Sequence, residues 1–196
     1  MTALPNDDAL DILFRKGRTF DEFLDTPVPD DLLRQAYNLA RMTPTSANCQ
    51  PMRILFVRSA EAKEQMAPAL SSTNREKSVR APVTAIIAHD LEFFENLPRL
   101  YRVPGTGKWF TGQEGLIAET AFRNSSLQGA SFMLAARAVG LGVGPMSGFD
   151  GDKIDEAFFA GTSWRSNFLC NLGFGDPATL PPRDPRLDFD EACRIV

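Results

Sequence analysis

The longest regular pattern in the sequence is a run of helical periodicity between about residues 114 and 139, and it limits the folds open to the chain. Apolar residues recur along it at helical spacings: Ile117, Ala121, Leu127, Leu134 and Ala138. Gly140 follows as a helix-ending glycine. The middle of the run is small and polar: Asn124, Ser125, Ser126, Gly129 and Ala130. Because small residues let another backbone approach closely, we predict that this helix lies at the centre of the fold or on a dimer axis.

Shorter patterns surround this helix and indicate both helices and strands. Helices are predicted at about 7–16, 30–40, 60–70 and 152–159, and strands at 53–58, 82–88, 141–149 and 167–174. Asp7 or Asp8 is expected to cap the first helix, and Gly17 to end it. The pattern predicts a single domain over residues 1–196, of α+β class, with a mixed central sheet covered by helices.

Two segments lack such a pattern. Residues 91–113 mix aromatic residues with prolines and glycines, which favours a mobile lid. The tail, residues 177–196, carries four prolines before residue 186. We expect the tail to wrap over a surface rather than to form an element of its own.

Composition argues against several classes of function. Lys and Arg number 21 against 25 Asp and Glu, giving a net charge of −4 without a long block of either sign, so a nucleic-acid partner is not expected. The single His89 and the three cysteines, Cys49, Cys170 and Cys193, are too few and too dispersed for a zinc site or a disulfide framework. No metal is therefore predicted. The start has no secretion-signal pattern and no apolar run reaches membrane-spanning length, so a cytoplasmic location is expected and a membrane partner is not.

Polar side chains suited to an anion occur at three separate places. Arg18 and Thr19 offer a guanidinium and a hydroxyl directly after the first predicted helix. Asn74 and Lys77 stand three residues apart, which places an amide and an ammonium on one side of a turn. Arg183 adds a cation in the tail. Taken singly, each of these residues is more typical of an ordinary exposed surface than of a binding site.

Two loops carry more polar groups than a simple connection needs. Residues 43–51 are uncharged, and six of their side chains can form hydrogen bonds. Residues 144–150 end a predicted strand with backbone N–H groups that nothing nearby in the sequence would satisfy. The glycines at 140, 142 and 144 do not make a dinucleotide fingerprint, because the third required glycine falls on Ser147.

The order and spacing of these motifs resemble the nitroreductase family of FMN enzymes over nearly the whole chain. The resemblance is carried by the loop 44–51 before a strand, the segment 145–150 after the long helix, Asn74 with Lys77, and 173–175 followed by Arg183. Within that family, the stretches 43–49, 69–72, 81–86, 119–126 and 144–150 are most similar to the malonic semialdehyde reductase branch of bacterial pyrimidine (uracil) degradation.

The resemblance implies an intertwined homodimer with FMN sites at the subunit interface. It implies that the flavin and its phosphate contact Arg18, Thr19, Asn74, Lys77 and Arg183, and that the other subunit contributes a loop with Pro44, Thr45, Ser46 and Asn48. The backbone N–H groups of Ser147 and Gly148 would face flavin N5 and the adjacent carbonyl. The chain departs from the family's pattern at two places. The match of residues 17–19 to the family's N-terminal phosphate site is ambiguous by one residue, and the family's second C-terminal cation would fall on Pro181.

The activity implied is an NAD(P)H-dependent, ping-pong reduction of malonic semialdehyde to 3-hydroxypropionate. Because the flavin carries the hydride, a chain without an acid–base pair is not handicapped. A small aldehyde acid still needs a cation for its carboxylate and a donor for its developing alkoxide. The residues considered for these tasks are Arg99, Arg102, Lys108, Arg123 and Asn124. Two alternatives remain: a nitroaromatic or quinone reductase, and a flavin-binding or interaction protein without turnover.

Overall fold

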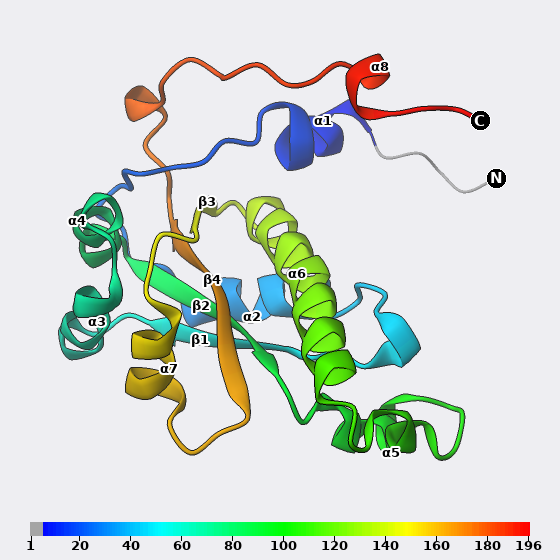
Figure 1. Cartoon of the computed structure of the whole chain (residues 1–196). Helices are drawn as coiled ribbons and strands as arrows, with labels where there is room; N and C mark the ends of the chain where they lie inside the picture. The colour runs from blue at the N-terminus through cyan, green and yellow to red at the C-terminus, as the bar shows by residue number, and fades with distance from the viewer. Residues whose placement is uncertain (1–5) are drawn as a thin grey trace.

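The long helix α6 (Glu114–Ala138) lies across a four-stranded sheet in the computed structural model, which describes residues 6–196 (Figure 1). Residues 1–5, on which the expectation about a secretion signal partly rests, lie outside the described part. Gly140 adopts a left-handed backbone conformation with φ of 88° just past the end of α6, as the sequence predicts. Leu127 and Ala138 depart from the expected apolar series, because both are exposed, Leu127 to 51%. No helix within residues 6–196 combines the length and apolarity needed to cross a membrane.

The sheet contains β1 (Met52–Val57), β2 (Val83–Asp90), β3 (Gly142–Met146) and β4 (Trp164–Gly173) in the order β1-β2-β4-β3. All three strand pairs are antiparallel. The sequence predicted a mixed sheet. Within residues 6–196, the parallel pairing in this sheet is a single bridge between Thr19 and Val143, where the N-terminal segment runs along the edge of β3. β2 is buried at every position, which agrees with the mainly apolar sequence of its first six residues.

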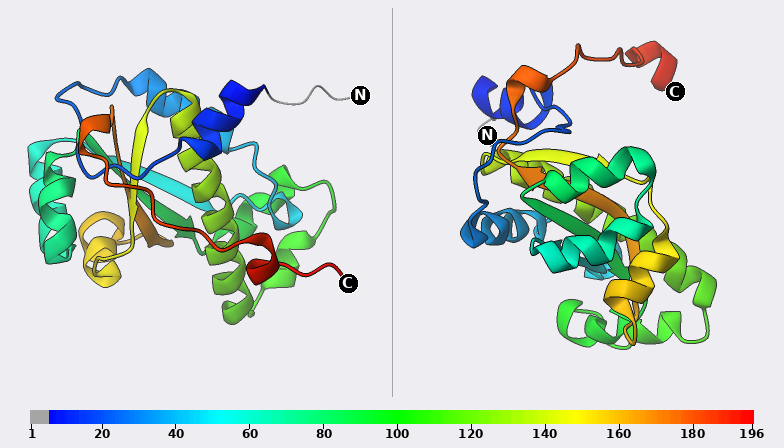
Figure 2. Two further views of the ribbon diagram at one scale, coloured as in Figure 1. Left: turned by 90° about the horizontal axis from the view of Figure 1, so that it is seen from above. Right: turned by 90° about the vertical axis from the view of Figure 1, so that its left-hand side faces the viewer.

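Helices cover both faces of this sheet, and they form an α+β architecture (Figures 1 and 2). On one face, α2 (Asp30–Ala40) and α6 pack on Val83, Ala85 and Ile87 of β2. On the other face, α3 (Ala60–Met66) and α7 (Gly151–Phe159) pack on Ile86 and Ala88. This division follows from the alternation of side chains along a strand. The other helices are α1 (Asp7–Leu10), α4 (Ser72–Arg80), α5 (Leu97–Leu100) and α8 (Phe189–Ala192).

Three details of the N-terminal and central helices differ from the predictions. Asn6, not Asp7 or Asp8, caps α1, because its Oδ1 accepts a hydrogen bond from Ala9 N at 2.9 Å. Gly17 is not a left-handed helix end. A Cβ there would lie 2.7 Å from Arg137 Nη1, so glycine leaves room for that guanidinium. Gly129 of α6 makes room for the ring of Phe168 rather than for another backbone.

The segment predicted as a lid and the tail both contain short elements. Within 91–113, α5 and two 3₁₀ turns surround a small core in which Phe93, Leu97 and Phe110 are buried. Contrary to the expectation for the tail, residues 177–179 form a 3₁₀ turn and α8 has a capping box at Asp188. The tail passes beside the N-terminal segment in two views (Figures 1 and 2).

Candidate functional site

The N-terminal segment and the tail bring two of the predicted cations to one place. Phe20 N donates a hydrogen bond to Val143 O at 2.9 Å, which holds the segment on the β3 edge. Arg18 Nη2 donates to the carbonyl oxygen of Pro181 in the tail. Arg183 Nη2 donates to Gly17 O at 2.8 Å and to Arg15 O at 3.0 Å. The two arginines therefore lie where the tail meets residues 15–18.

Helix α4 adds an ammonium that contacts the N-terminal segment at Asp21 and an amide that contacts the turn after β3. Lys77 Nζ lies 2.8 Å from Asp21 Oδ1, so it faces the same N-terminal segment. The Asn74 side chain is buried, and its Nδ2 donates to Gly148 O at 3.0 Å. We call the set Arg18, Thr19, Asn74, Lys77, Ser147, Gly148 and Arg183 the N-terminal site.

The turn after β3 presents two free backbone donors in the N-terminal site. Within residues 6–196, the N–H groups of Ser147 and Gly148 donate no hydrogen bond. Ser71 N donates to Gly148 O at 3.1 Å, so the turn is fixed from the α4 side. A Cβ at position 148 would lie 2.6 Å from Asn74 Nδ2, so glycine is what lets the turn approach the amide this closely.

A buried polar network, which sequence reasoning missed, ties α4 to the sheet. Thr84 Oγ1 lies 2.7 Å from Asn171 Oδ1, and Asn171 Nδ2 donates to Ser78 Oγ at 3.3 Å. Ser78 Oγ in turn donates to Met146 Sδ at 3.4 Å, on the strand that leads to Ser147. The only sequence signal was a polar residue within an otherwise apolar strand. Buried polar groups that are fully paired make their surroundings rigid. The network therefore holds α4 and the end of β3, which carry residues of the N-terminal site, against the sheet.

Arg137 is a further cation that the sequence did not single out. Its Nη1 donates to Leu13 O at 3.0 Å, and its guanidinium lies against Gly17. Burial lowers the pKa of the Arg137 guanidinium. Its Nε is buried and has no hydrogen-bond partner within residues 6–196. In sequence, Arg137 resembles any basic residue in the last turn of a helix.

The polar loop 43–50 lies apart from the N-terminal site and has a strained backbone. Ala47, Asn48 and Gln50 adopt φ values of 49°, 51° and 41°, a left-handed region that non-glycine residues rarely enter. The loop is fixed by side chains: Asn124 Oδ1 accepts from Ser46 N at 2.8 Å, and Asn48 Nδ2 donates to Leu100 O at 2.8 Å. Strain of this kind persists only where surrounding contacts over-determine it, and it often occurs at functional sites.

The thiol of Cys49 and the chain's single imidazole, His89, are both buried. Cys49, within the polar loop, is buried, and desolvation raises the pKa of its thiol to about 11. Desolvation lowers the pKa of His89, whose ring contacts Phe122 edge-on with centroids 5.9 Å apart. Cys49 is therefore a protonated thiol and His89 a neutral, packed imidazole at neutral pH.

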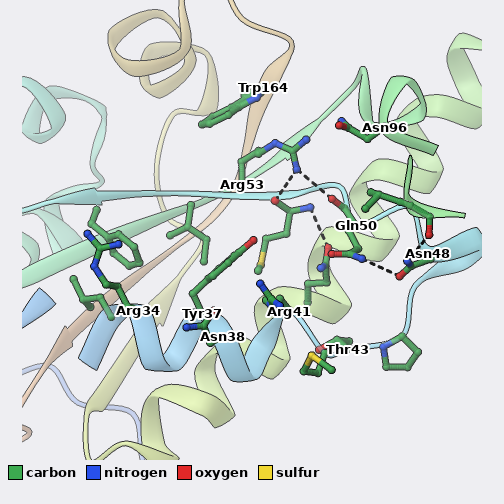
Figure 3. A pocket seen from close by; sticks show the side chains of 18 of the residues that line it. Arg34, Tyr37, Asn38, Arg41, Thr43, Asn48, Gln50, Arg53, Asn96 and Trp164 are labelled. Carbon is green, nitrogen blue, oxygen red and sulfur yellow. Dashed lines mark hydrogen bonds between the residues drawn. The ribbon is translucent and has the colours of Figure 1, made fainter. Parts of the chain in front are cut away.

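A cavity of about 1470 Å³ opens beside the polar loop, between α2, β1 and the end of α5 (Figure 3). We call it the arginine cavity, because five arginines line it: Arg34, Arg41, Arg53, Arg58 and Arg99. Pro44 and Asn48 of the polar loop also line it. Of its arginines, sequence reasoning had selected Arg99 alone. The available signal was the spacing of Arg34 and Arg41, seven residues apart on one helix.

The residues considered for substrate binding fall in different settings. Arg99 lines the arginine cavity and donates to Asn96 Oδ1 at 2.9 Å. Arg102 and Lys108 are exposed. Arg123 forms an ion pair with Glu119, and both polar atoms of Asn124 are engaged, by Ser46 N and by Thr120 O. Of the five, Arg99 is the one placed in a cavity.

Comparison with known proteins places the chain among a large group of similar sequences and folds. The model of the Nitroreductase family matches residues 18–174. A protein of Burkholderia lata is 56% identical over 195 residues, covering 100% of both chains, and one of Stenotrophomonas maltophilia is 59% identical over 188 residues, covering 96% of each. Both carry the provisional name NADH dehydrogenase/NAD(P)H nitroreductase. A crystal structure from Exiguobacterium sibiricum, provisionally named a nitroreductase and solved in complex with FMN, is 21% identical over 100% of both chains with a TM-score of 0.83.

Proposed function

The chain belongs to the nitroreductase family, and on that premise we propose that it is an FMN-dependent oxidoreductase that takes its electrons from NADH or NADPH. The observation that carries the proposal is a row of polar groups along the N-terminal segment and the turn after β3: Arg18 and Arg183 where the tail meets the segment, Lys77 paired with Asp21, and Asn74 bonded to the turn that has two free N–H groups. The names of the relatives and the FMN bound to the Exiguobacterium protein support it.

The N-terminal site suits the chemistry of FMN at both ends of that molecule. Arg18, Lys77 and Arg183 would hold the dianionic phosphate, for which guanidinium and ammonium groups are the usual partners. The N–H groups of Ser147 and Gly148 are free to face the ring edge that contains N5 and a carbonyl. The closeness of Gly148 to Asn74, which a Cβ would prevent, keeps that edge within reach of the amide.

The chain's own contribution is to orient the reactants and to stabilise charge. FMN, when bound, supplies the hydride transfer between NAD(P)H and the acceptor. The N–H groups of Ser147 and Gly148 would stabilise negative charge at the ring edge that they face, because preorganised donors need no rearrangement when charge develops. The network through Ser78 and Asn171 would hold that turn in place.

We further propose that the chain forms a homodimer and that the polar loop of one subunit completes the flavin site of the other. Within the described part of one chain, no hydrogen bond or ion pair joins residues 43–50 to the N-terminal site. Helix α6 also leaves apolar side chains uncovered: Leu116, Phe122 and Leu127 are 44%, 53% and 51% exposed. Molar mass from light scattering after gel filtration tests the dimer, and a monomer that binds and reduces FMN would contradict it.

For the acceptor, we propose malonic semialdehyde, reduced to 3-hydroxypropionate in pyrimidine degradation. The aldehyde carbon would receive the hydride and its oxygen a proton, while a cation holds the carboxylate. Arg99 is the cation best placed for that task, because it lines the arginine cavity beside the polar loop. The resemblance of residues 43–49 and 144–150 to that branch of the family supports this acceptor.

The second candidate is a nitroaromatic or quinone acceptor, which the aromatic side chains Tyr37 and Trp164 in the cavity favour. Aromatic walls bind flat rings by stacking, whereas a three-carbon acid gains little from them.

The decisive first measurement is the absorption spectrum of the purified protein after incubation with FMN. We expect flavin bands that bleach within one turnover time when NADH or NADPH is added anaerobically. A protein that stays colourless defeats the proposal, and a coloured one that does not bleach is a flavin binder without turnover. The ratio of kcat/KM for malonic semialdehyde to that for a nitroaromatic then decides between the two acceptors.

A further inference from the structure

Arg137, in the last turn of α6, is a half-buried cation whose side chain leaves its own helix. A basic residue in a final helical turn ordinarily binds the last carbonyl groups of that helix. Arg137 Nη1 instead donates to Leu13 O at 3.0 Å, the one hydrogen bond of this guanidinium within residues 6–196. Its Nε is buried and has no partner there. The side chain therefore connects the end of α6 to the N-terminal segment.

Gly17 is the residue at which Arg137 meets the backbone of that segment. A Cβ at position 17 would lie 2.7 Å from Arg137 Nη1 and 2.8 Å from its Cζ, so the guanidinium rests directly on the glycine. Arg183, from the tail, donates to Gly17 O at 2.8 Å. Figure 1 shows the N-terminal segment between this end of α6 and the tail. Two guanidinium groups from distant parts of the chain thus contact one glycine.

Three guanidinium groups contact residues 13–18 or extend from them without a carboxylate partner in the described part of the chain: Arg18, Arg137 and Arg183. Carboxylates are present close by in the sequence, but Asp7 pairs with Arg15, and Asp11 pairs with Arg15 and Lys16. The segment thus carries neutralised charges on one side of Gly17 and unneutralised ones around it.

Keeping Arg137 charged in this place has a cost. Burial lowers the pKa of its guanidinium, and the nearby charge of Arg183 lowers it further. Both causes act against the charged form, because water is removed from it and a like charge lies close. A bound anion offsets such a cost, since it supplies the negative charge that the chain does not. The three arginines therefore fit an anion that comes from a ligand.

We propose that Arg137 is a positioning residue for the phosphate of FMN and that it acts through Gly17. Its contacts with Leu13 O and Gly17 fix the backbone from which Arg18 extends, and its charge lies behind that backbone. Arg18 and Arg183 contact the phosphate, whereas Arg137 does not touch it. The inference rests on the proposed function, because it takes the anion at the N-terminal site to be the phosphate of FMN. Glycine is required at position 17, because a side chain there displaces the guanidinium.

The test compares FMN with riboflavin, which has the same ring system and lacks the phosphate. Fluorescence titration of the flavin-free protein gives the Kd for each flavin. Arg137→Gln keeps an N–H donor for Leu13 O but removes the charge, so its Kd for FMN should rise about tenfold and its Kd for riboflavin should stay within about twofold. Arg137→Lys keeps the charge and should stay within about threefold of wild type for FMN.

Arg165→Gln is the matched control. Arg165 is exposed and also donates to backbone carbonyls, Thr162 O at 3.3 Å and Trp164 O at 2.7 Å. It lies at the start of β4, whereas the N-terminal segment pairs near the other end of the sheet, at Val143 and Gly175. Its Kd for both flavins should match wild type within about twofold, because no contact near the phosphate changes.

Gly17→Ala tests the same arrangement from the backbone side, and it carries the test if Arg137→Gln does not fold. The added Cβ displaces the guanidinium, so the Kd for FMN should rise about as much as in Arg137→Gln, again without a comparable change for riboflavin. The double variant should bind FMN no more weakly than about twofold beyond either single variant, because both remove one shared contact. Fully multiplied effects would show that Arg137 does not act through Gly17.

The outcomes separate this inference from the proposed function. An equal loss for FMN and riboflavin in Arg137→Gln would mean a structural role alone, and an unchanged Kd for FMN would mean no role; either overturns the inference. A wild type that binds no flavin would defeat the proposed function. The thermal midpoint of the flavin-free protein in inorganic phosphate would still decide about Arg137: phosphate should raise the Tm of wild type more than that of Arg137→Gln. Equal rises, or no rise in wild type, would overturn the inference.

Discussion

The N-terminal site and the arginine cavity are both rich in cations, but they hold those cations differently. In the N-terminal site, Arg18 and Arg183 donate to backbone carbonyls and Lys77 is paired with Asp21. In the cavity, the side chains of Arg34 and Arg41 form no hydrogen bond within the described residues. Donors fixed in advance suit a cofactor that stays bound, because little entropy is lost when it binds. Free donors on an open wall of the single chain are available to a group that the chain itself does not supply.

The difference between the two regions is tested most directly by removing two cations from each region in turn and measuring the affinity for FMN. Arg18→Ala/Arg183→Ala should raise the Kd for FMN about 100-fold, because two charge-assisted contacts to the phosphate disappear. Arg34→Ala/Arg41→Ala should leave that Kd within about twofold, since no FMN contact is removed. Quenching of FMN fluorescence on titration measures both. Equal weakening by the two double variants would show that the regions are not distinct.

The strand edge that supports the N-terminal site can be tested through Gly144 of β3. A Cβ there would lie 2.4 Å from Phe20 O, a backbone atom that cannot move aside cheaply. Gly144→Ala should therefore lower the free energy of unfolding by about 2 kcal/mol, as overpacking does. Urea denaturation measures it. Gly115→Ala in α6 is the matched control: a Cβ there meets nothing within 4 Å, so alanine should stabilise by up to about 1 kcal/mol.

The polar loop beside the arginine cavity depends on Asn124. Asn124→Ala removes the acceptor of Ser46 N and the donor to Thr120 O, so we expect a loss of about 1.5 kcal/mol in the free energy of unfolding. Ser131→Ala, which removes one exposed hydroxyl bonded to Leu127 O on the same helix, should cost under about 0.5 kcal/mol. Chemical denaturation of the two variants gives the comparison. Equal losses would mean that the contact to Ser46 does not anchor the loop.

The smallest expected effect is a pH dependence from His89, which pairs with Met52 in the cavity wall. Burial lowers its pKa below the ordinary value of 6.5, so the unfolded chain takes up the proton first as pH falls. Wild type should lose stability relative to His89→Gln below pH 6.5, by at most about 1.4 kcal/mol per pH unit, with a constant difference above it. Denaturation curves at pH 8 and pH 5.5 measure this. A difference that does not change with pH would show that His89 titrates alike in the folded and unfolded chain.

Local features of the sequence predicted most elements but not their capping and packing details. Pro29 and Pro44 bracket α2, and Gly140 marks the end of α6, because these residues restrict the backbone whatever surrounds them. The N-cap at Asn6 and the reason for Gly17 were missed. The first depends on which neighbouring side chain reaches the helix, and the second on Arg137 of a distant helix.

The residues of the N-terminal site were selected from the sequence through family resemblance, whereas the arginine cavity was not. Arg34 and Arg41 look like exposed residues of an amphipathic helix, and Arg53 like an ordinary residue of an edge strand. They line one cavity only because α2, β1 and the start of β4 enclose the same space. No pattern within a few residues of sequence carries that information.

By itself, the sequence determined where helices, strands and polar loops occur, since backbone restriction and hydrophobic periodicity act over a few neighbouring residues. Only the tertiary structure decided which polar groups meet. Gly17 and Arg183 are 166 residues apart in the chain yet joined by a hydrogen bond of 2.8 Å. Such a meeting depends on how the sheet and the tail bring the two ends of the chain together, and the interaction between them is as short-ranged as any other hydrogen bond.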